Sequence, residues 1–519
     1  MDLSGTDLQG QSPLDVEVLT KMAGQMFNEI AGSSLPARDL DLSGLELRDR
    51  SVDEQLLSKL AAEYMKQVPA GEALPSSPQG LPTSHAPSFY FLDEYRSKLG
   101  AEVPALPEAV HPPFDAASVR TDFPILREWV NGRPLIWLDN GATTQKPQAV
   151  IDRLRFFYEH ENSNVHRAAH ELARRSTDAY EAARETVRRY LGASKVEEIV
   201  FVRGTTEGIN LVAQSWGRNN VREGDEILIT WLEHHANIVP WQMLCNATGA
   251  KLKVVPVDDR GQVILEEYER LLSDRTKIAA FSHVSNALGT VTPVQQMIEM
   301  AHRYGALALV DGAQAVAHTP VNVQALDCDW YVFSGHKIFG PTGIGVVYGK
   351  AAVLESSPPW QGGGSMIRDV TFEKTEYNVI PAKFEAGTGN IADAVGLGTA
   401  LEYVERVGLE NIARHEHELL THATRLLSEV PGLRIIGTAA EKAGVISFVM
   451  DGITVEEIGK ALNLEGIAVR AGHHCAQPIL RRFGVEATVR PTFALYNTFA
   501  DVDALAAAVQ RIRASKPTI

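Results

Sequence analysis

Apolar runs of strand length alternate with helix-patterned segments along most of this chain. From about residue 123 onward, such runs lie at 198–203, 226–231, 277–282 and 306–311, with helical patterns between them. This alternation is typical of an α/β domain with a mainly parallel sheet. After about residue 395, the pattern predicts an amphipathic helix at 400–407 and a smaller α+β region. We therefore expect a large α/β domain followed by a small C-terminal domain.

The first part of the chain has a different pattern. Short apolar stretches recur up to about residue 68, and prolines then recur between 69 and 113 around the aromatic patch 89–91. Proline at this density prevents long helices and central strands. Two interpretations follow: a disordered tail, or a docking segment whose apolar islands fold on binding a partner. The predicted divisions are 1–113 for this targeting or docking segment, 114–395 for the large domain with the N-terminal part of the small one, and 396–519 for the small domain.

Composition narrows the class of protein. The chain has 519 residues, which is too long for one ordinary core. Its content of 45% hydrophobic and 22% charged residues is typical of a globular protein. Its net charge of −16 argues against nucleic acid as a partner. With only three cysteines, no secretory signal and no apolar run long enough for a membrane span, the sequence favours the reducing cytoplasm.

The most informative polar residues follow two of the apolar runs. Lys337 closes the stretch 334–337 directly after the run 330–333, and Asp311 ends the run that begins at residue 306. Ligands bind at strand ends in open α/β sheets. A pyridoxal phosphate (PLP) enzyme requires a lysine for the aldehyde and an acid that faces the ring nitrogen. A lysine after a strand is ordinarily a solvated loop residue, but together the two residues favour a PLP site.

A phosphate-binding turn is predicted after another strand. The run 199–202 leads into Gly204-Thr205-Thr206 at a predicted helix start, where free backbone N–H groups and the helix dipole favour a phosphate. An ordinary capped helix explains an isolated Gly-Thr-Thr equally well. Beside Lys337 and Asp311, however, this turn becomes a phosphate cradle, with the stretch 334–337 supplying further donors.

Two adjacent histidines, His234 and His235, follow the run 226–231. One of them is suited to stacking on a planar ring and to transferring a proton near neutral pH. Adjacent histidines also suggest a metal, but their spacing does not match a zinc signature and no nearby cysteine or acid pattern completes one. We therefore expect no metal site.

Cys475 directly follows two histidines and lies near Arg470 and Arg490 in the sequence. Such an electropositive setting favours the thiolate, and a fixed arginine suits a substrate carboxylate. An isolated cysteine is more often a buried structural thiol, but in this context we expect a nucleophile. Cys245 and Cys328 lack a comparable setting and are expected to be inert.

Together these motifs resemble a known family. From about residue 118 to its C-terminus, the chain resembles the SufS-type (group II) cysteine desulfurases within the class V aminotransferase superfamily. The resemblance rests on motifs in family order at 138–143, 164–167, 203–210, 233–241, 283–286, 310–314, 334–337, 384–388 and 470–475. It implies a PLP-dependent transferase of fold type I, with a mainly parallel seven-stranded sheet, that acts as a homodimer.

The resemblance also implies how the cofactor is held. It places Lys337 on the cofactor aldehyde, Asp311 on the pyridine nitrogen, Gln314 on the ring hydroxyl and His234 on the ring face. The phosphate would be held by Thr205, Thr206, Ser334 and His336, with Thr388 reaching it from the other subunit.

For the substrate, the resemblance implies L-cysteine, with Arg490 on its carboxylate. Asn286, Arg470, His166 and Arg167 are implied as further substrate contacts. The Cys475 thiolate would attack the substrate sulfur, which leaves a persulfide on the enzyme and releases alanine. Because the stretch after Cys475 is short and bounded by proline, an acceptor of the SufE or SufU kind is expected to come to the persulfide.

Three departures from the family pattern stand out. Pro491 and Thr492 follow Arg490 where the family usually has Ala-Ser, and proline removes an N–H donor beside the carboxylate site. Residue 471 is alanine where threonine is common in the family. The N-terminal extension resembles that of cysteine desulfurases carried inside encapsulin-type shells, which implies a shell protein as partner of residues 1–113 and a cytoplasmic nanocompartment as location.

Two alternatives stay open. The same scaffold supports selenocysteine lyase or another PLP-dependent β-elimination. Alternatively, the chain is an interaction or scaffold protein with a vestigial catalytic domain, although the intact set of lysine, aspartate, histidine and cysteine argues against this.

Overall fold

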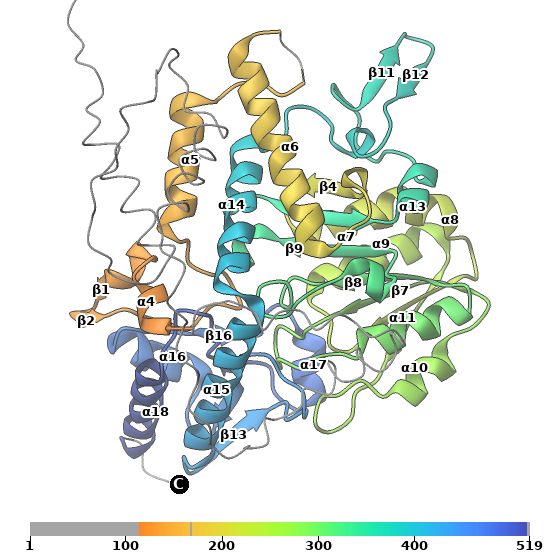
Figure 1. The fold of residues 1–519 in the computed structure, drawn as a ribbon. Coiled ribbons are helices and arrows are strands. Elements are labelled where there is room, and N and C mark those ends of the chain that lie inside the picture. Colours follow the sequence, from red (N-terminus) through yellow and green to blue (C-terminus); the bar gives the residue numbers. More distant parts are fainter. Residues whose placement is uncertain (1–113, 167–168, 516–519) are drawn as a thin grey trace, which may run out of the picture. The chain divides into compact units, whose positions relative to one another are not determined.

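A seven-stranded sheet forms the centre of the large domain, as the sequence predicts (Figure 1). The computed structural model describes residues 114–166 and 169–515, so the predicted docking segment 1–113 lies outside the described residues. The strand order is β4-β10-β9-β8-β7-β5-β6. β10 runs antiparallel to both of its neighbours, and the other neighbouring pairs are parallel. The strands are β4 (Ile199–Val202), β5 (Glu226–Thr230), β6 (Lys251–Val255), β7 (Thr276–Ser282), β8 (Leu307–Asp311), β9 (Trp330–Ser334) and β10 (Gly345–Gly349).

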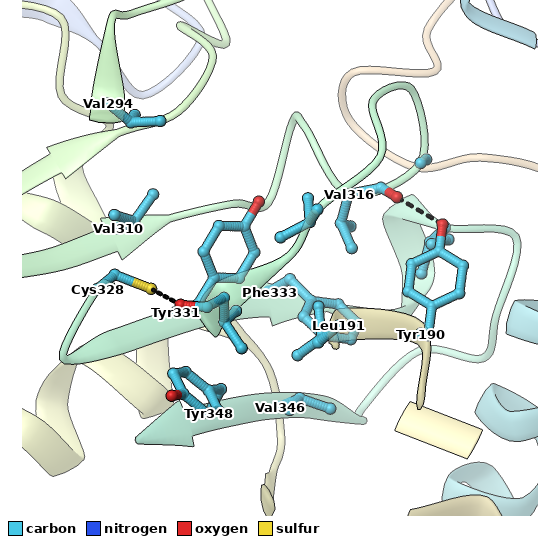
Figure 2. Close-up of a cluster of buried hydrophobic side chains, with 14 of the residues drawn as sticks. Tyr190, Leu191, Val294, Val310, Val316, Cys328, Tyr331, Phe333, Val346 and Tyr348 are labelled. Atoms are coloured by element: carbon cyan, nitrogen blue, oxygen red, sulfur yellow. Dashed lines mark hydrogen bonds between the residues drawn. The ribbon is translucent and has the colours of Figure 1, made fainter. Parts of the chain in front are cut away.

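Both faces of this sheet are covered, because successive side chains of a strand point to opposite sides. In β9, Tyr331 and Phe333 pack into one core cluster, while Trp330 and Val332 pack into the other. Figure 2 shows part of the first cluster, where side chains of β9 and β10 meet the C-terminal end of α6. There the Tyr190 hydroxyl donates to the carbonyl of Val316 (2.8 Å), so the buried phenol keeps a partner. Double coverage explains why the strands appear in the sequence as continuous apolar runs.

Helix α14 packs against both α5 and α6 on the side of the sheet that carries the first cluster (Figure 1). Helix α14 begins well before the predicted helix 400–407 and includes residue 395, the predicted domain boundary. It is buried over most of its circumference, so the sequence lacks a clear helical period at its start. The helices up to this point are α4 (Ala116–Arg120), α5 (Gln148–His160), α6 (Glu171–Leu191), α7 (Thr205–Val212), α8 (Arg218–Asn220), α9 (Val239–Thr248), α10 (Leu265–Leu271), α11 (Val294–Arg303), α12 (Val323–Leu326), α13 (Ala351–Ser356) and α14 (Ile391–Val407).

The C-terminal region is an α+β unit with a four-stranded sheet of order β13-β14-β17-β16. An early segment also joins it, since β3 (Ile136–Trp137) pairs in parallel with β15 (Ile467–Ala468). The remaining elements of this unit are α15 (Leu409–Ser428), β13 (Leu433–Ile436), β14 (Ser447–Met450), α16 (Val455–Leu464), β16 (Arg470–Gly472), α17 (Gln477–Arg482), β17 (Thr488–Arg490) and α18 (Phe499–Ala514).

A two-stranded hairpin projects from the large domain. It consists of β11 (Ile367–Val370) and β12 (Thr375–Tyr377), which pair antiparallel. Phe372 in its turn is fully exposed, at 107% of the reference area.

Candidate active site

One cavity of about 250 Å³ lies at the carboxyl ends of the sheet strands, where the small domain meets the large one. Parallel strands point their carboxyl ends to one edge, so residues far apart in sequence converge there. The cavity contains most of the residues predicted from the sequence. They are Thr205, Thr206, His234, Asn286, Asp311, Gln314, Ser334, His336, Lys337, Arg470, Cys475 and Arg490.

Lys337 and Asp311 carry the charges at the floor of this cavity. Lys337 ends the short helix η5 (Gly335–Lys337) after β9, and burial lowers its pKa to about 8. Asp311 ends β8, and burial raises the pKa of its carboxyl, against the effect of the Ala313 N–H (2.9 Å to Oδ1) and of Lys337. A Cβ at Gly312 would lie 2.1 Å from the Tyr331 ring, so a larger residue directly after Asp311 would displace that buried ring.

The N-terminus of α7 forms a polar corner of the same cavity. The backbone N–H of Thr205 and its hydroxyl both lie 2.8 Å from Ser334 Oγ. This contact joins the end of β4 to the end of β9, although the residues are far apart in sequence. Free N–H groups of the first helical turn, with hydroxyls beside them, are suited to a phosphate.

His234 stands over the cavity as a neutral imidazole. Burial lowers its pKa to about 3, and the nearby charge of Lys337 acts in the same direction. Its Nδ1 accepts a hydrogen bond from the Ala236 N–H (3.0 Å), so the proton of the neutral ring belongs on Nε2. The ring is therefore fixed in one tautomer, with Nε2–H as its free donor.

Arg490 is the buried cation of the site, with only 2% of its surface exposed. Its Nη1 donates to the Asn286 carbonyl (2.8 Å), and its Nη2 lies 3.3 Å from Asp139 Oδ1. Asn286 Nδ2 in turn donates to the carbonyl of His474 (2.7 Å). These contacts hold the end of β17 against the Cys475 loop.

Three buried polar atoms at this end of the cavity have no partner within the described residues. They are Arg490 Nε, Asn286 Oδ1 and His474 Nδ1. Buried polar atoms are normally hydrogen-bonded, so a ligand is the natural partner. The guanidinium matches a carboxylate and the amide oxygen matches an N–H donor. An α-amino acid offers both groups.

Cys475 lies in a strained loop between β16 and α17. Both His474 (φ 54°) and Cys475 (φ 53°) are in the left-handed region, which side-chain-bearing residues rarely adopt. The thiol is half-buried, whereas Cys245 and Cys328 are buried, and burial raises the pKa of both of those thiols. Only Cys475 among the three cysteines therefore lines the cavity.

Two predicted site residues within the described ranges lie outside the cavity. His166 is exposed, with Nε2 3.1 Å from Glu181 Oε1, and Thr388 is exposed, with its hydroxyl 3.4 Å from Asn164 Oδ1. Arg167 lies outside the described residues. Thr388 is predicted to contact the cofactor of a second subunit, so it is not expected to line the cavity of its own chain.

The sequence analysis missed several polar residues that belong to the site. Ser282 and His474 line the cavity, and Asp139 pairs with Arg490. All three lie inside or beside motifs that were recognised as a whole. Ser282 ends the predicted strand 277–282, which was the available signal for that residue, whereas Asp139 and His474 had no signal beyond their motifs.

Comparison with known proteins places the chain in a family. A family model described as aminotransferase class V matches residues 136–505. The chain belongs to the aminotransferase class V family. Its fold is accordingly the PLP-dependent fold type I.

Relatives within this family are cysteine desulfurases. One from Synechococcus elongatus is 71% identical over 400 residues, which cover 77% of this chain and 64% of that relative. One from Mycobacterium leprae, described as probable, is 65% identical and is covered over 65% of its length. The chain thus spans less than two thirds of these two relatives. A cysteine desulfurase from Escherichia coli is 50% identical over 400 residues and is covered over 98% of its length.

Solved structures give the same result for the fold. The cysteine desulfurase CsdA from Escherichia coli, in its S-sulfonic acid form, superposes with a TM-score of 0.72 at 41% identity. The apo cysteine desulfurase of Thermococcus onnurineus gives 0.74 at 36% identity. Both matches cover 77% of this chain and 98% of the other.

Within residues 114–166 and 169–515, no helix has both the length and the hydropathy needed to cross a membrane. The same residues contain no cluster of three or more histidines, cysteines or acids with the geometry of a metal site.

Proposed function

We propose that this protein is a PLP-dependent cysteine desulfurase of the SufS type (group II), which converts L-cysteine to L-alanine and keeps the sulfur as a persulfide on Cys475. The observation that carries the proposal is the shared cavity. A half-buried lysine and a buried aspartate suited to the cofactor line the same cavity as a half-buried thiol and a buried arginine. The high identity of cysteine desulfurases across most of this chain supports it.

The residues present fit the cofactor. Lys337 supplies an amine for the aldehyde, Asp311 a buried carboxylate for the ring nitrogen and His234 a flat neutral ring. Gln314, whose Nε2 donates to the Gly141 carbonyl (2.6 Å), is proposed for the ring hydroxyl. Phosphate contacts are proposed for Thr205, Thr206, Ser334 and His336. When bound, PLP supplies an electron sink that stabilises negative charge at the substrate Cα.

The substrate would be held by its carboxylate and ammonium groups. Arg490 Nε faces the carboxylate and Asn286 Oδ1 accepts from the ammonium, which would satisfy two of the unpartnered atoms. Arg470, exposed at the cavity mouth, would add positive charge. For His166 and Arg167 the substrate role stays a proposal from the family resemblance.

The chain's own residues would then act on protons and sulfur. The Lys337 amine, once free, takes the proton from Cα and returns a proton to the product. The Cys475 thiolate attacks the substrate sulfur, so that an S–S bond forms as the Cβ–S bond breaks. The net exchange balances: L-cysteine and a thiol give L-alanine and a persulfide, with no external oxidant.

Substitution of Cys475 tests this proposal. Cys475→Ser should lower alanine formation from L-cysteine at least ~10²-fold while the bound cofactor keeps its visible absorbance. Cys245→Ser removes a buried thiol outside the cavity and serves as the matched control. Unchanged alanine and sulfide release by Cys475→Ser would contradict the persulfide step. Parallel assays with L-selenocysteine show which of the two amino acids the enzyme prefers.

We further propose a homodimer, with Thr388 reaching the cofactor phosphate of the partner subunit. The exposed position of Thr388 and the exposed Phe372 on the β11–β12 hairpin support a second chain on this side. The tight loop at Cys475 supports transfer to an acceptor protein of the SufE or SufU kind. As a location we propose the cytoplasm, where the three free cysteines stay reduced.

For residues 1–113 we propose docking to an encapsulin-type shell protein. The support is the sequence pattern, in which apolar islands alternate with proline-rich stretches. The sulfur would then be released or stored inside that compartment.

A further inference from the structure

A buried carboxylate lies directly behind the two-histidine turn. Glu233 has 1% of its surface exposed and follows β5 by three residues. Its oxygens accept from four donors: Thr230 Oγ1 (2.5 Å), Asn237 Nδ2 (2.7 Å), Ser282 Oγ (2.7 Å) and the Ser282 N–H (3.2 Å). We call Glu233 with Thr230, Asn237 and Ser282 the Glu233 network. It joins the end of β5 to the end of β7, at the edge of the sheet where the cavity lies.

The Glu233 network also fixes both ends of the turn that carries His234 and His235. Glu233 precedes the first histidine, and Asn237 ends the short helix η4 (His235–Asn237). The Asn237 Oδ1 in turn accepts from Trp241 Nε1 (2.8 Å), which extends the network into α9. The turn therefore has little freedom to tilt either imidazole.

The second histidine of the turn holds the Cys475 loop. Its N–H donates to the Cys475 carbonyl (2.8 Å), and its Nε2 accepts from the N–H of Gln477 (3.4 Å). The ring of His235 also stacks on His473 (5.9 Å between centroids, 29° between planes). His473 Nδ1 accepts from the Cys475 N–H (3.0 Å).

These contacts account for the strained backbone of the loop. Two successive residues in the left-handed region persist only where the surroundings over-determine them. Here the carbonyl of Cys475 is held by His235, and that of His474 is held by Asn286. The turn thus contacts the nucleophile loop on one side and faces the cofactor site on the other.

We propose that Glu233 is a positioning residue that sets the two-histidine turn, and through it both the ring of His234 and the main chain of Cys475. The coupling of the turn to catalysis rests on the proposed function, whereas the coupling of the turn to the Cys475 loop does not. Burial raises the pKa of Glu233 to about 7, with the Asp311 charge acting in the same direction. Above that pH the carboxyl is mainly ionised and is an acceptor only, so it matches the four donors in number and kind.

Glu233→Gln tests the role because glutamine has the same shape but turns two N–H groups toward donors. The matched control is Glu226→Gln. Glu226 is a buried glutamate at the opposite end of β5, where it accepts from Ser273 and Thr276 hydroxyls. Thr230→Val is a milder second variant, since it removes a single hydroxyl from the Glu233 network.

The first readout is hydrogen exchange in the cofactor-free, full-length protein. Amides of 234–241 and of 473–477 should exchange about tenfold faster in Glu233→Gln than in wild type, and Thr230→Val should give a smaller increase in both segments. Glu226→Gln should leave both segments as in wild type. Faster exchange at 234–241 with wild-type exchange at 473–477 would overturn the coupling. Wild-type exchange in both segments would overturn the proposal itself.

The second readout uses the holoenzyme. Glu233→Gln should slow persulfide formation on Cys475 about tenfold and shift the visible band of the cofactor, because both the ring of His234 and the main chain of Cys475 move. Slower persulfide formation together with an unshifted cofactor band and wild-type amide exchange would overturn the positioning role of Glu233. If wild type itself forms no persulfide, the proposed function fails while the exchange result still decides the role of Glu233.

Discussion

At the scale of single residues, burial sets the charges in the cavity. It lowers the pKa of Lys337 to about 8, of His234 to about 3 and of His474 to about 2. Both imidazoles are therefore neutral near pH 7, and they act as fixed hydrogen-bonding groups. The positive charge that remains near pH 7 is that of Arg490, Arg470 and Lys337, which favours a carboxylate in the cavity.

Capture of PLP by the cofactor-free protein should accelerate with pH, because the neutral amine of Lys337 is the nucleophile. The neutral fraction grows as the pH rises through the lowered pKa of about 8, so the rate should rise between about pH 6 and pH 9 and then level off. Stopped-flow absorbance measures this rate. Lys442, a second half-buried lysine whose pKa is lowered to about 8, supplies the control variant Lys442→Arg, which should keep the profile. A rate of PLP capture that is independent of pH would contradict the role of the Lys337 amine as the nucleophile.

Sequence reasoning identified Lys337, Asp311 and Cys475 because each lies in a local pattern that is recognisable without the fold. Glu233 was recognised only as part of a motif. Its role depends on Ser282, a donor 49 residues away in the sequence on a neighbouring strand. Such a partner becomes visible only when strand order and register are known.

At the scale of elements, one buried ion pair attaches α6 to the segment that carries Thr388. Arg184 Nη1 lies 2.7 Å from Glu385 Oε1, and the Arg184 side chain is 3% exposed. Glu385 also accepts from the backbone N–H of Phe201 (2.8 Å) in β4. This single carboxylate therefore joins a helix, a strand and the segment that leads to the predicted dimer contact.

Glu385→Gln should destabilise the protein by about 2–3 kcal/mol, since it leaves the buried Arg184 guanidinium with the half-exposed Glu181 as its carboxylate partner, besides the Ile199 carbonyl. Chemical denaturation measures the free energy of unfolding. Glu185→Gln breaks the exposed pair with Arg188 on the same helix and should cost less than about 0.5 kcal/mol. Equal effects of the two substitutions would contradict the special role of the buried pair.

Strands β4, β5, β7 and β8 were predictable because their side chains are buried on both faces, whereas the partly exposed strand β6 was not predicted. Helix α14 was predicted only in part, since its burial removes the polar face from which a helical period is recognised. The pairing of β3 with β15 could not be predicted, because two-residue strands carry no pattern of their own.

At the scale of the whole molecule, we expect residues 1–113 to serve docking and the rest of the chain to serve catalysis. A variant that lacks residues 1–113 should form alanine at a rate within about twofold of wild type, because the described residues that line the cavity all lie after residue 140. The same variant should lose co-purification with an encapsulin-type shell protein. Loss of turnover would show that the segment belongs to the active site.

The most direct measurement of the central claim is mass analysis of the holoenzyme after brief incubation with L-cysteine, followed by peptide mapping. The account predicts one added sulfur atom on the peptide that contains Cys475, released by a thiol reductant and absent in both Cys475→Ser and Lys337→Ala. Alanine formation without added sulfur on that peptide would contradict it.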